Sequence, residues 1–341
     1  MPEQRQANTT DLTKKKQRPK IGLYLKPRDV EVVKTLWRYR IMRESTLHRL
    51  CFHTVAHQRK AQARLKQLCE EGYLNRRFPP IVHPDNKGVI DYIHQDRRQV
   101  VYWVERRGAE ELLRDSPPDD ERRERLRSIK NLSEWSESRL NHWLDLSDIR
   151  ACLELAVEKT PEVHLAGWYD EHDKNEQELI LKAKVKIPYG DTGRERPFTL
   201  CPDACFILED EDSDRQEFFF VEIDEGTESA RERWRDKVLA YLAYSEQGFE
   251  DDFEFEGKEF RMLTVTRSQG DKDQAKRKQT LLKTTFNAGG RGRFWFSTFE
   301  ALMPGDTVTG EHFLTGKIWQ RARREEIEKK VGLALRDNLF V

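Results

Sequence analysis

The sequence contains few cysteines and no long apolar run. Its cysteines are odd in number and form no C-x-x-C pair, which argues against a disulfide framework and a zinc site: Cys51, Cys69, Cys152, Cys201 and Cys205. No apolar stretch approaches the length of a membrane span, and residues 1–20 lack the apolar core of a secretory signal. We therefore expect reduced thiols in a bacterial cytoplasm and no association with a membrane.

Three catalytic signatures are also missing. The stretch nearest to a G-x-x-x-x-G-K-[ST] phosphate-binding loop ends at Gly316 and Lys317, with the wrong spacing and with Ile318 in place of the hydroxyl residue. No G-x-S-x-G serine elbow occurs. None of the nine histidines forms the His-x-His cluster that relaxases with a tyrosine nucleophile normally need. These absences set aside P-loop NTPases, serine hydrolases and relaxases of that type.

Charge is abundant and unevenly distributed. The 341 residues include 61 Lys and Arg and 61 Asp and Glu, so the formal net charge is zero. Up to Glu105 the chain carries 22 basic and 11 acidic residues, which leaves 61 − 22 = 39 basic and 61 − 11 = 50 acidic residues for the remainder. A basic front half followed by an acidic back half favours a polyanion partner for the front half.

The front half has the pattern of a DNA-binding domain. Helical spacing predicts helices after Pro27, from Ser45 and over residues 55–71, and a strand is predicted at residues 100–104. This is the order of a winged helix-turn-helix domain, which we place at residues 21–115. In that fold the third helix enters the DNA major groove and the wing follows the backbone. The candidate DNA-binding residues are Arg59, Lys60 and Lys66 on the helix, and Arg97 and Arg98 in the wing. The alternatives are a charged solvent face and a protein-binding module.

The remaining boundaries follow from composition. Residues 1–20 carry the cluster KKKQRPK and are expected to form a disordered basic tail, which either touches DNA or only solubilises the chain. Residues 116–133 are dense in charge and proline and are predicted to form a linker. We place a second, α/β domain at residues 134–305 and a helical extension at residues 306–341. Within the second domain we expect, among other elements, strands at residues 179–185 and 260–266 and a basic helix at residues 275–286. An amphipathic helix is expected over residues 317–341, either docked on the body or used for dimerisation.

A predicted β-hairpin carries the strongest chemical signal. Asp203 opens one strand, an acidic turn is centred on Ser213, and the return strand ends with Glu222 and Asp224, which point to the same face. If Asp203 lies opposite either of these acids, three carboxylates converge, and such a cluster requires a proton or a cation. Oxygen ligands suit Mg²⁺ or Mn²⁺. The alternative is an acidic hairpin rim that only solvates a strand end.

This arrangement resembles the PD-(D/E)XK nuclease core, in which Asp begins one strand and (D/E)-x-K ends the next. Asp203 matches the first position and Glu222 the second, whereas Asp224 stands where that family normally has Lys. Some members of that superfamily supply the Lys from the following helix, and Lys237 is the candidate here; otherwise it is an ordinary surface lysine. The resemblance makes Asp203, Glu222, Asp224 and Lys237 candidate catalytic residues, the three acids also being metal ligands.

Three further side chains are candidate supporting residues. Tyr241 lies four residues after Lys237, on the same helical face. His142 and Asp148 lie in a long helical pattern over residues 135–159, from which nucleases of this type often draw an acid. For His142 the alternative is a core or capping histidine.

The two halves together resemble the replication-relaxation family of plasmid and mobile-element proteins, over residues 26–302. The resemblance implies a DNA-binding protein that acts in replication or relaxation of mobile DNA. Within it we expect a metal-dependent DNA endonuclease or nickase, a non-catalytic DNA-binding regulator, or an adaptor for a partner protein, with a homodimer also open. The residues that carry the resemblance are Arg28, Asp29, Leu47, Leu50, Phe52, Leu65, Leu68, Gly72, Tyr102, Gly108, Leu112, His142, Asp148, Pro202, Asp203, Glu222, Ile223, Asp224, Gly226, Lys237 and Tyr241.

Overall fold

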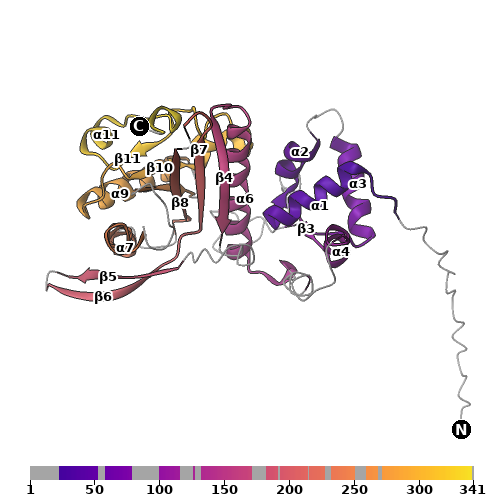
Figure 1. Ribbon diagram of the computed structural model, residues 1–341, viewed down its shortest axis with the longest axis horizontal. Helices are drawn as coiled ribbons and strands as arrows, with labels where there is room; N and C mark the ends of the chain where they lie inside the picture. The colour runs from indigo at the N-terminus through magenta and orange to yellow at the C-terminus, as the bar shows by residue number, and fades with distance from the viewer. Residues whose placement is uncertain are drawn as a thin grey trace, which may run out of the picture.

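The computed structural model shows a mixed α+β protein (Figure 1). It describes residues 23–52, 58–78, 100–115, 126, 132–170, 182–190, 193–213, 215–226, 232–249, 259–267 and 271–339. The expected basic tail, the predicted wing with Arg97 and Arg98, and most of the predicted linker lie outside these residues. Within the described part, no helix has both the length and the apolarity needed to cross a membrane.

The N-terminal part consists of helices around a small antiparallel sheet with strand order β1-β3-β2. The buried stripe of α3, Ala61, Leu65 and Leu68, faces the core as its spacing predicts. The elements are α1 (Pro27–Tyr39), β1 (Ile41–Arg43), α2 (Glu44–Phe52), α3 (Gln58–Glu70), β2 (Leu74–Arg77), β3 (Val101–Val104) and α4 (Arg106–Leu112).

The second part is built on a six-stranded sheet with strand order β11-β10-β9-β8-β7-β4. The three strands β8, β9 and β10 are parallel, and the other neighbours pair antiparallel. The elements are α6 (Glu137–Val157), β4 (Val163–Asp170), β5 (Ala183–Tyr189), β6 (Arg194–Leu200), β7 (Ala204–Asp210), β8 (Gln216–Asp224), α7 (Arg233–Gln247), β9 (Phe260–Thr266), α9 (Asp271–Asn287), β10 (Phe294–Thr298), α10 (Phe299–Leu302), β11 (Gln320–Arg321) and α11 (Arg324–Lys329).

Helices cover both faces of this sheet. Helix α6 lies on one face, and α7 and α9 lie on the other (Figure 1). Along β8 the side chains alternate between the two cores: Phe219 and Val221 face α6, whereas Phe218 and Phe220 face α7. The core on the α6 side is continuous with the core of the N-terminal part. Helix α6 therefore joins the two parts through one buried apolar cluster.

Strands β5 and β6 form a separate two-stranded arm. The sequence predicted only one strand here, at residues 179–185, and the return strand was not expected. The inner face of the arm, with Val185, Ile187 and Leu200, packs on α7. Figure 1 shows the arm extending away from the domain at its lower left. Strand β6 ends three residues before Asp203, so the arm leads directly into the predicted acidic hairpin.

The prediction of one long helix over residues 317–341 was wrong. Strand β11 instead pairs with β10, where Gln320 stands opposite Phe296, and Trp319 is fully buried. Helix α11 is short and ends at Lys329, and the following residue, Lys330, adopts the left-handed conformation. Of the apolar residues that suggested an amphipathic helix, Ile327 and Leu335 are buried in separate cores, whereas Val331 is exposed. The expected helical extension at residues 306–341 instead supplies an edge strand to the second domain.

Candidate active site

Asp203 and Glu222 face each other across the β7–β8 hairpin. Ala204 pairs with Val221 in the antiparallel ladder, and the Asp203 N–H donates to the Val221 carbonyl at 3.1 Å, so Asp203 continues the ladder opposite Glu222. The Asp203 carboxylate also accepts a hydrogen bond of 2.7 Å from the backbone N–H of Ile223. The position of the turn, with Ser213 midway between Asp203 and Ile223, left open which of residues 222–224 faces Asp203, and the observed register decides it. Asp203 lies opposite one of the two acids and not opposite Ile223.

Helix α7 directs two side chains at Glu222. The Lys237 ammonium donates to one carboxylate oxygen at 2.6 Å, and the Tyr241 hydroxyl donates to the other at 2.7 Å. The spacing of four residues places both donors on one face of the helix, as the sequence predicted. Glu222 is only 1% exposed. Burial, with a smaller contribution from the charge of Asp203, raises the pKa of Glu222 to about 7, although the charge of Lys237 opposes the shift.

Asp224 points to the same face of β8 as Glu222 but has a different partner. The Arg277 guanidinium, on α9, donates to both of its carboxylate oxygens, at 2.7 and 2.9 Å. A bidentate pair of this kind occupies both oxygens in a fixed geometry. The structure therefore brings together Asp203 and Glu222, with Lys237 and Tyr241, and binds the third predicted acid to Arg277.

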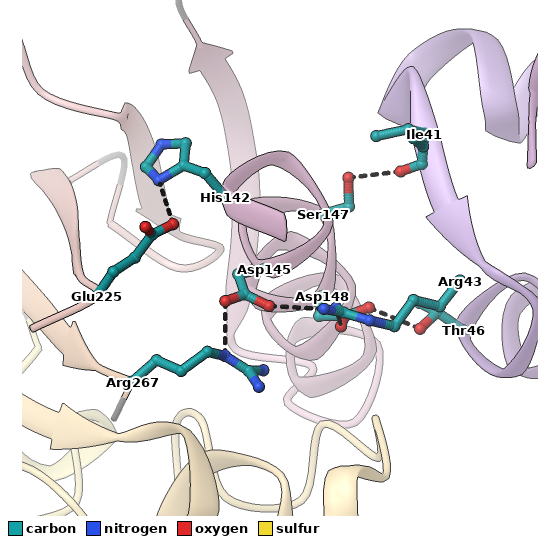
Figure 2. A network of polar contacts seen from close by, with 9 residues as sticks. All are labelled: Ile41, Arg43, Thr46, His142, Asp145, Ser147, Asp148, Glu225 and Arg267. Atoms are coloured by element: carbon teal, nitrogen blue, oxygen red, sulfur yellow. Dashed lines mark hydrogen bonds and ion pairs between the residues drawn. The ribbon is translucent and has the colours of Figure 1, made fainter. Parts of the chain in front are cut away.

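His142 connects α6 to the same acids. Its Nε2 lies 3.3 Å from the Asp203 carboxylate, and its Nδ1 lies 3.4 Å from Glu225, the contact drawn in Figure 2. Burial by itself lowers the pKa of His142, but these two carboxylates outweigh it and raise the pKa to about 10. The charged imidazolium in turn holds the pKa of Asp203 below its ordinary value, against the effect of burial. His142 thus lies beside the acids and is not an isolated core or capping residue.

The repulsion among the acids is relieved by the protein's own cations. Lys237, His142 and Arg277 each contact one or more of them. Among the residues that the structure describes, no three His, Cys, Asp or Glu side chains converge as ligands for one metal ion. Asp203 and Glu222 supply hard oxygen donors of the type that Mg²⁺ and Mn²⁺ take. Two of the three predicted ligands therefore fit such an ion, and Asp224 does not in this arrangement.

Asp148 lies at the junction of the two domains. Its carboxylate accepts a hydrogen bond of 2.7 Å from the Thr46 hydroxyl and is paired with Arg43, both from the N-terminal domain. One turn earlier on α6, Asp145 forms ion pairs with two arginines (Figure 2). It lies 2.8 Å from Arg43 and 2.6 Å from Arg267, the residue that follows β9. Although burial by itself lowers the pKa of Arg43, the charges of Asp148 and Asp145 raise it above its ordinary value. Asp148 therefore contributes to the domain junction instead of the acid cluster.

Comparison with known proteins identifies the family. The model of the replication-relaxation family matches residues 34–254, well over half of the chain. The chain belongs to the replication-relaxation family. No curated protein and no solved structure matches it. The matched segment of this replication-relaxation protein runs from α1 to just beyond α7 and includes both the N-terminal helices and the Asp203–Glu222–Lys237 cluster.

The predicted DNA-binding residues of this family member that the structure describes lie on α3. Arg59, Lys60 and Lys66 are exposed, and Lys66 makes one long contact of 3.9 Å with Glu70. Arg64, on the same helix, is used differently, because its Nε donates to the Asp29 carboxylate of α1 at 2.9 Å. The exposed cations of α3 thus form a surface, while Arg64 fixes the helix to the domain. Arg97 and Arg98 lie outside the described residues.

Three residues that matter in this replication-relaxation protein were missed from the sequence. Arg277 binds Asp224, and Glu225 contacts His142. Asp145 joins the two domains through Arg43. The basic pattern around residues 275–286 signalled a charged helix, but nothing local assigned Arg277 to a carboxylate 53 positions earlier. Asp145 had a visible signal, since an acid one turn from Asp148 extends the same helical face.

Proposed function

We propose that this replication-relaxation protein binds duplex DNA through a winged helix-turn-helix domain and hydrolyses a phosphodiester bond in it with a PD-(D/E)XK-type site. The observation that carries the proposal is the placement of Lys237, 2.6 Å from Glu222 and on the helix that follows its strand, beside Asp203. This is the position from which a lysine on the following helix can replace the lysine that the E-x-D pattern lacks.

Each side chain has a distinct role in the proposed reaction. Asp203 and Glu222 would hold Mg²⁺ or Mn²⁺, which when bound lowers the pKa of water and stabilises charge on the phosphate oxygens. Lys237 orients the attacking water through its ammonium group. Tyr241 fixes the Glu222 carboxylate by donating to it, and His142 positions Asp203 from α6. Glu222 must be ionised to bind the cation, which favours activity above about pH 7.

DNA recognition is assigned to the exposed face of α3. Arg59, Lys60 and Lys66 are exposed there, and family membership points to partners connected with plasmid or mobile-element DNA. Contacts of this type neutralise phosphates, so they make binding dependent on salt concentration. The domain junction through α6 holds this face and the acid cluster in one body, which would deliver bound DNA to the second domain at a fixed geometry.

A second candidate function is that of a non-catalytic DNA-binding regulator or adaptor. The specific observation in its favour is the Asp224–Arg277 pair, which stands where the nuclease pattern has a lysine. The acids are also neutralised by Lys237 and His142. In this alternative the cluster is a structural element, and the protein binds DNA without divalent ions and does not nick it.

A plasmid-nicking assay with Mg²⁺, Mn²⁺ or a chelator distinguishes the two candidates. We expect Asp203→Asn and Lys237→Met to lower nicking by at least about a hundredfold, the scale for loss of one electrostatic group of an active site, with unchanged DNA affinity. The matched controls are Glu209→Gln, in the same hairpin, and Lys283→Met, on α9. If the wild-type protein binds DNA but does not nick it with either metal ion, the regulator is supported. Nicking that survives Asp203→Asn contradicts the proposed site.

A further inference from the structure

The β5–β6 arm carries a concentrated positive charge on an otherwise acidic part of the chain. Residues 182–190 and 193–200 contain five cations and a single acid, Glu195, whereas the chain after Glu105 has 39 basic and 50 acidic residues. The five cations are Lys182, Lys184, Lys186, Arg194 and Arg196. This arm was not predicted from the sequence, and the proposed active site does not use it.

Three of these cations form a row. Lys182, Lys184 and Lys186 alternate with the residues that pack on α7, so they occupy the outer face of the arm, and all three are exposed. Among the described residues, no ion pair or hydrogen bond involves the side chain of any of the three. By contrast, Arg196 on the inner face is paired with Asp236 of α7, which anchors the arm. No residue that the structure describes therefore neutralises the charges of the outer row.

The spacing of the row suits a nucleic acid strand. Alternate residues of a β-strand are about 6.6 Å apart, and two base-pair steps of a DNA strand rise about 6.8 Å. The arm has seven residues in each strand, which corresponds to a length of about 20 Å. At its far end Tyr189 is 57% exposed and stands opposite Arg194. A row of regularly spaced cations along a strand is complementary in charge to a phosphate backbone.

The base of the arm lies next to the acid cluster. Strand β6 ends at Leu200 and the chain reaches Asp203 three residues later. On the other side, Asp236, which holds Arg196, directly precedes Lys237 in α7. A duplex whose phosphate enters the cluster therefore has its flanking backbone within reach of the outer lysines.

We propose that the β5–β6 arm is a second DNA contact, in which Lys182, Lys184 and Lys186 bind the phosphates of duplex DNA beside the candidate active site. This inference rests on the proposed DNA binding but not on catalysis. A competing role for lysines on such a ribbon is to prevent the strands from pairing with those of other molecules. That role predicts self-association of variants and no change in DNA affinity.

The test measures DNA binding of the full chain to a 30-base-pair duplex in chelator, so that cleavage does not interfere. The variant is Lys182→Ala/Lys184→Ala/Lys186→Ala, and the matched control is Lys283→Ala/Lys317→Ala/Lys329→Ala, which removes the same charge from exposed positions of the α9 and α11 side. Figure 1 shows α11 at the top of the second domain and the arm at the bottom. Circular dichroism of both variants establishes that they remain folded.

The expected result is a shallower dependence of affinity on salt. Each lost phosphate contact reduces the steepness of the plot of log affinity against log salt by about 0.9. The slope of the arm variant should therefore be shallower than that of the wild type by about 2.7, and that of the control by less than about one. The charge reversal Lys184→Glu/Lys186→Glu should weaken binding at 0.1 M salt by more than tenfold. If the arm variant keeps both the slope and the DNA affinity of the wild type, the proposal for the arm is overturned but the proposed function is not. A wild-type protein that does not bind the duplex overturns both this proposal and the proposed function.

Discussion

Replacing Asp145 by asparagine tests how much the buried ion pairs of α6 stabilise the protein. Asp145 is 1% exposed and pairs with both Arg43 and Arg267, whose side chains are 18% and 32% exposed. Asparagine keeps the shape and removes the charge, so Arg267 loses its carboxylate partner while Arg43 retains Asp148. Breaking one side of a buried ion pair costs about 3–5 kcal/mol. Because both arginines keep some solvent, we expect the lower end, about 3 kcal/mol.

Urea unfolding, followed by circular dichroism and tryptophan fluorescence, measures this loss. The matched control is Glu110→Gln, which breaks the exposed pair with Arg106 and should cost no more than about 0.5 kcal/mol. A double-mutant cycle of Asp145→Asn with Arg267→Met isolates the interaction between the two, for which we expect at least about 1 kcal/mol. If Asp145→Asn is as stable as the control variant, the network at the junction does not stabilise the protein and the reasoning is refuted.

Three further predictions concern the acid cluster and the packing of the N-terminal domain. The pKa of Glu222 is raised to about 7, so its contribution to stability is present below its ordinary pKa and is lost as pH rises through 7. Relative to Glu222→Gln, the free energy of unfolding of the wild type should fall by about 3 kcal/mol between pH 4.5 and pH 8. Curves of stability against pH that run parallel for the two proteins would contradict this. Arg277→Met leaves Asp224 buried without its bidentate partner and should lower the free energy of unfolding by about 3 kcal/mol, whereas an unchanged urea midpoint would show that water replaces the arginine. Gly108→Ala places a Cβ 2.3 Å from the backbone carbonyl of Tyr73 and should destabilise the protein by about 1–3 kcal/mol in thermal unfolding; full wild-type stability would mean that the helix can shift at no cost.

Local patterns in the sequence determined the hairpin that carries the acids. The charged turn around Ser213 predicted that Asp203 lies across from residues 222–224, and the observed register of Ala204 with Val221 places it opposite Glu222. The strand over residues 260–266 was predicted with the bounds that β9 has. Helical spacing also predicted that Lys237 and Tyr241 share one face, and both contact Glu222. These features depend only on strand alternation, helical periodicity and turn composition, which act over a few residues.

Only the tertiary structure decided which partner each charged group has. Asp224 has the same strand position and chemistry as Glu222, yet α9 brings Arg277 to it from 53 positions away. Asp148 follows His142 by six residues on one helix, yet it binds the N-terminal domain while His142 binds Asp203. Gln320 and Arg321 form an edge strand on β10 instead of the start of a long helix. Such outcomes depend on how crossover connections place elements distant in sequence, and short-range patterns hold no information about that placement.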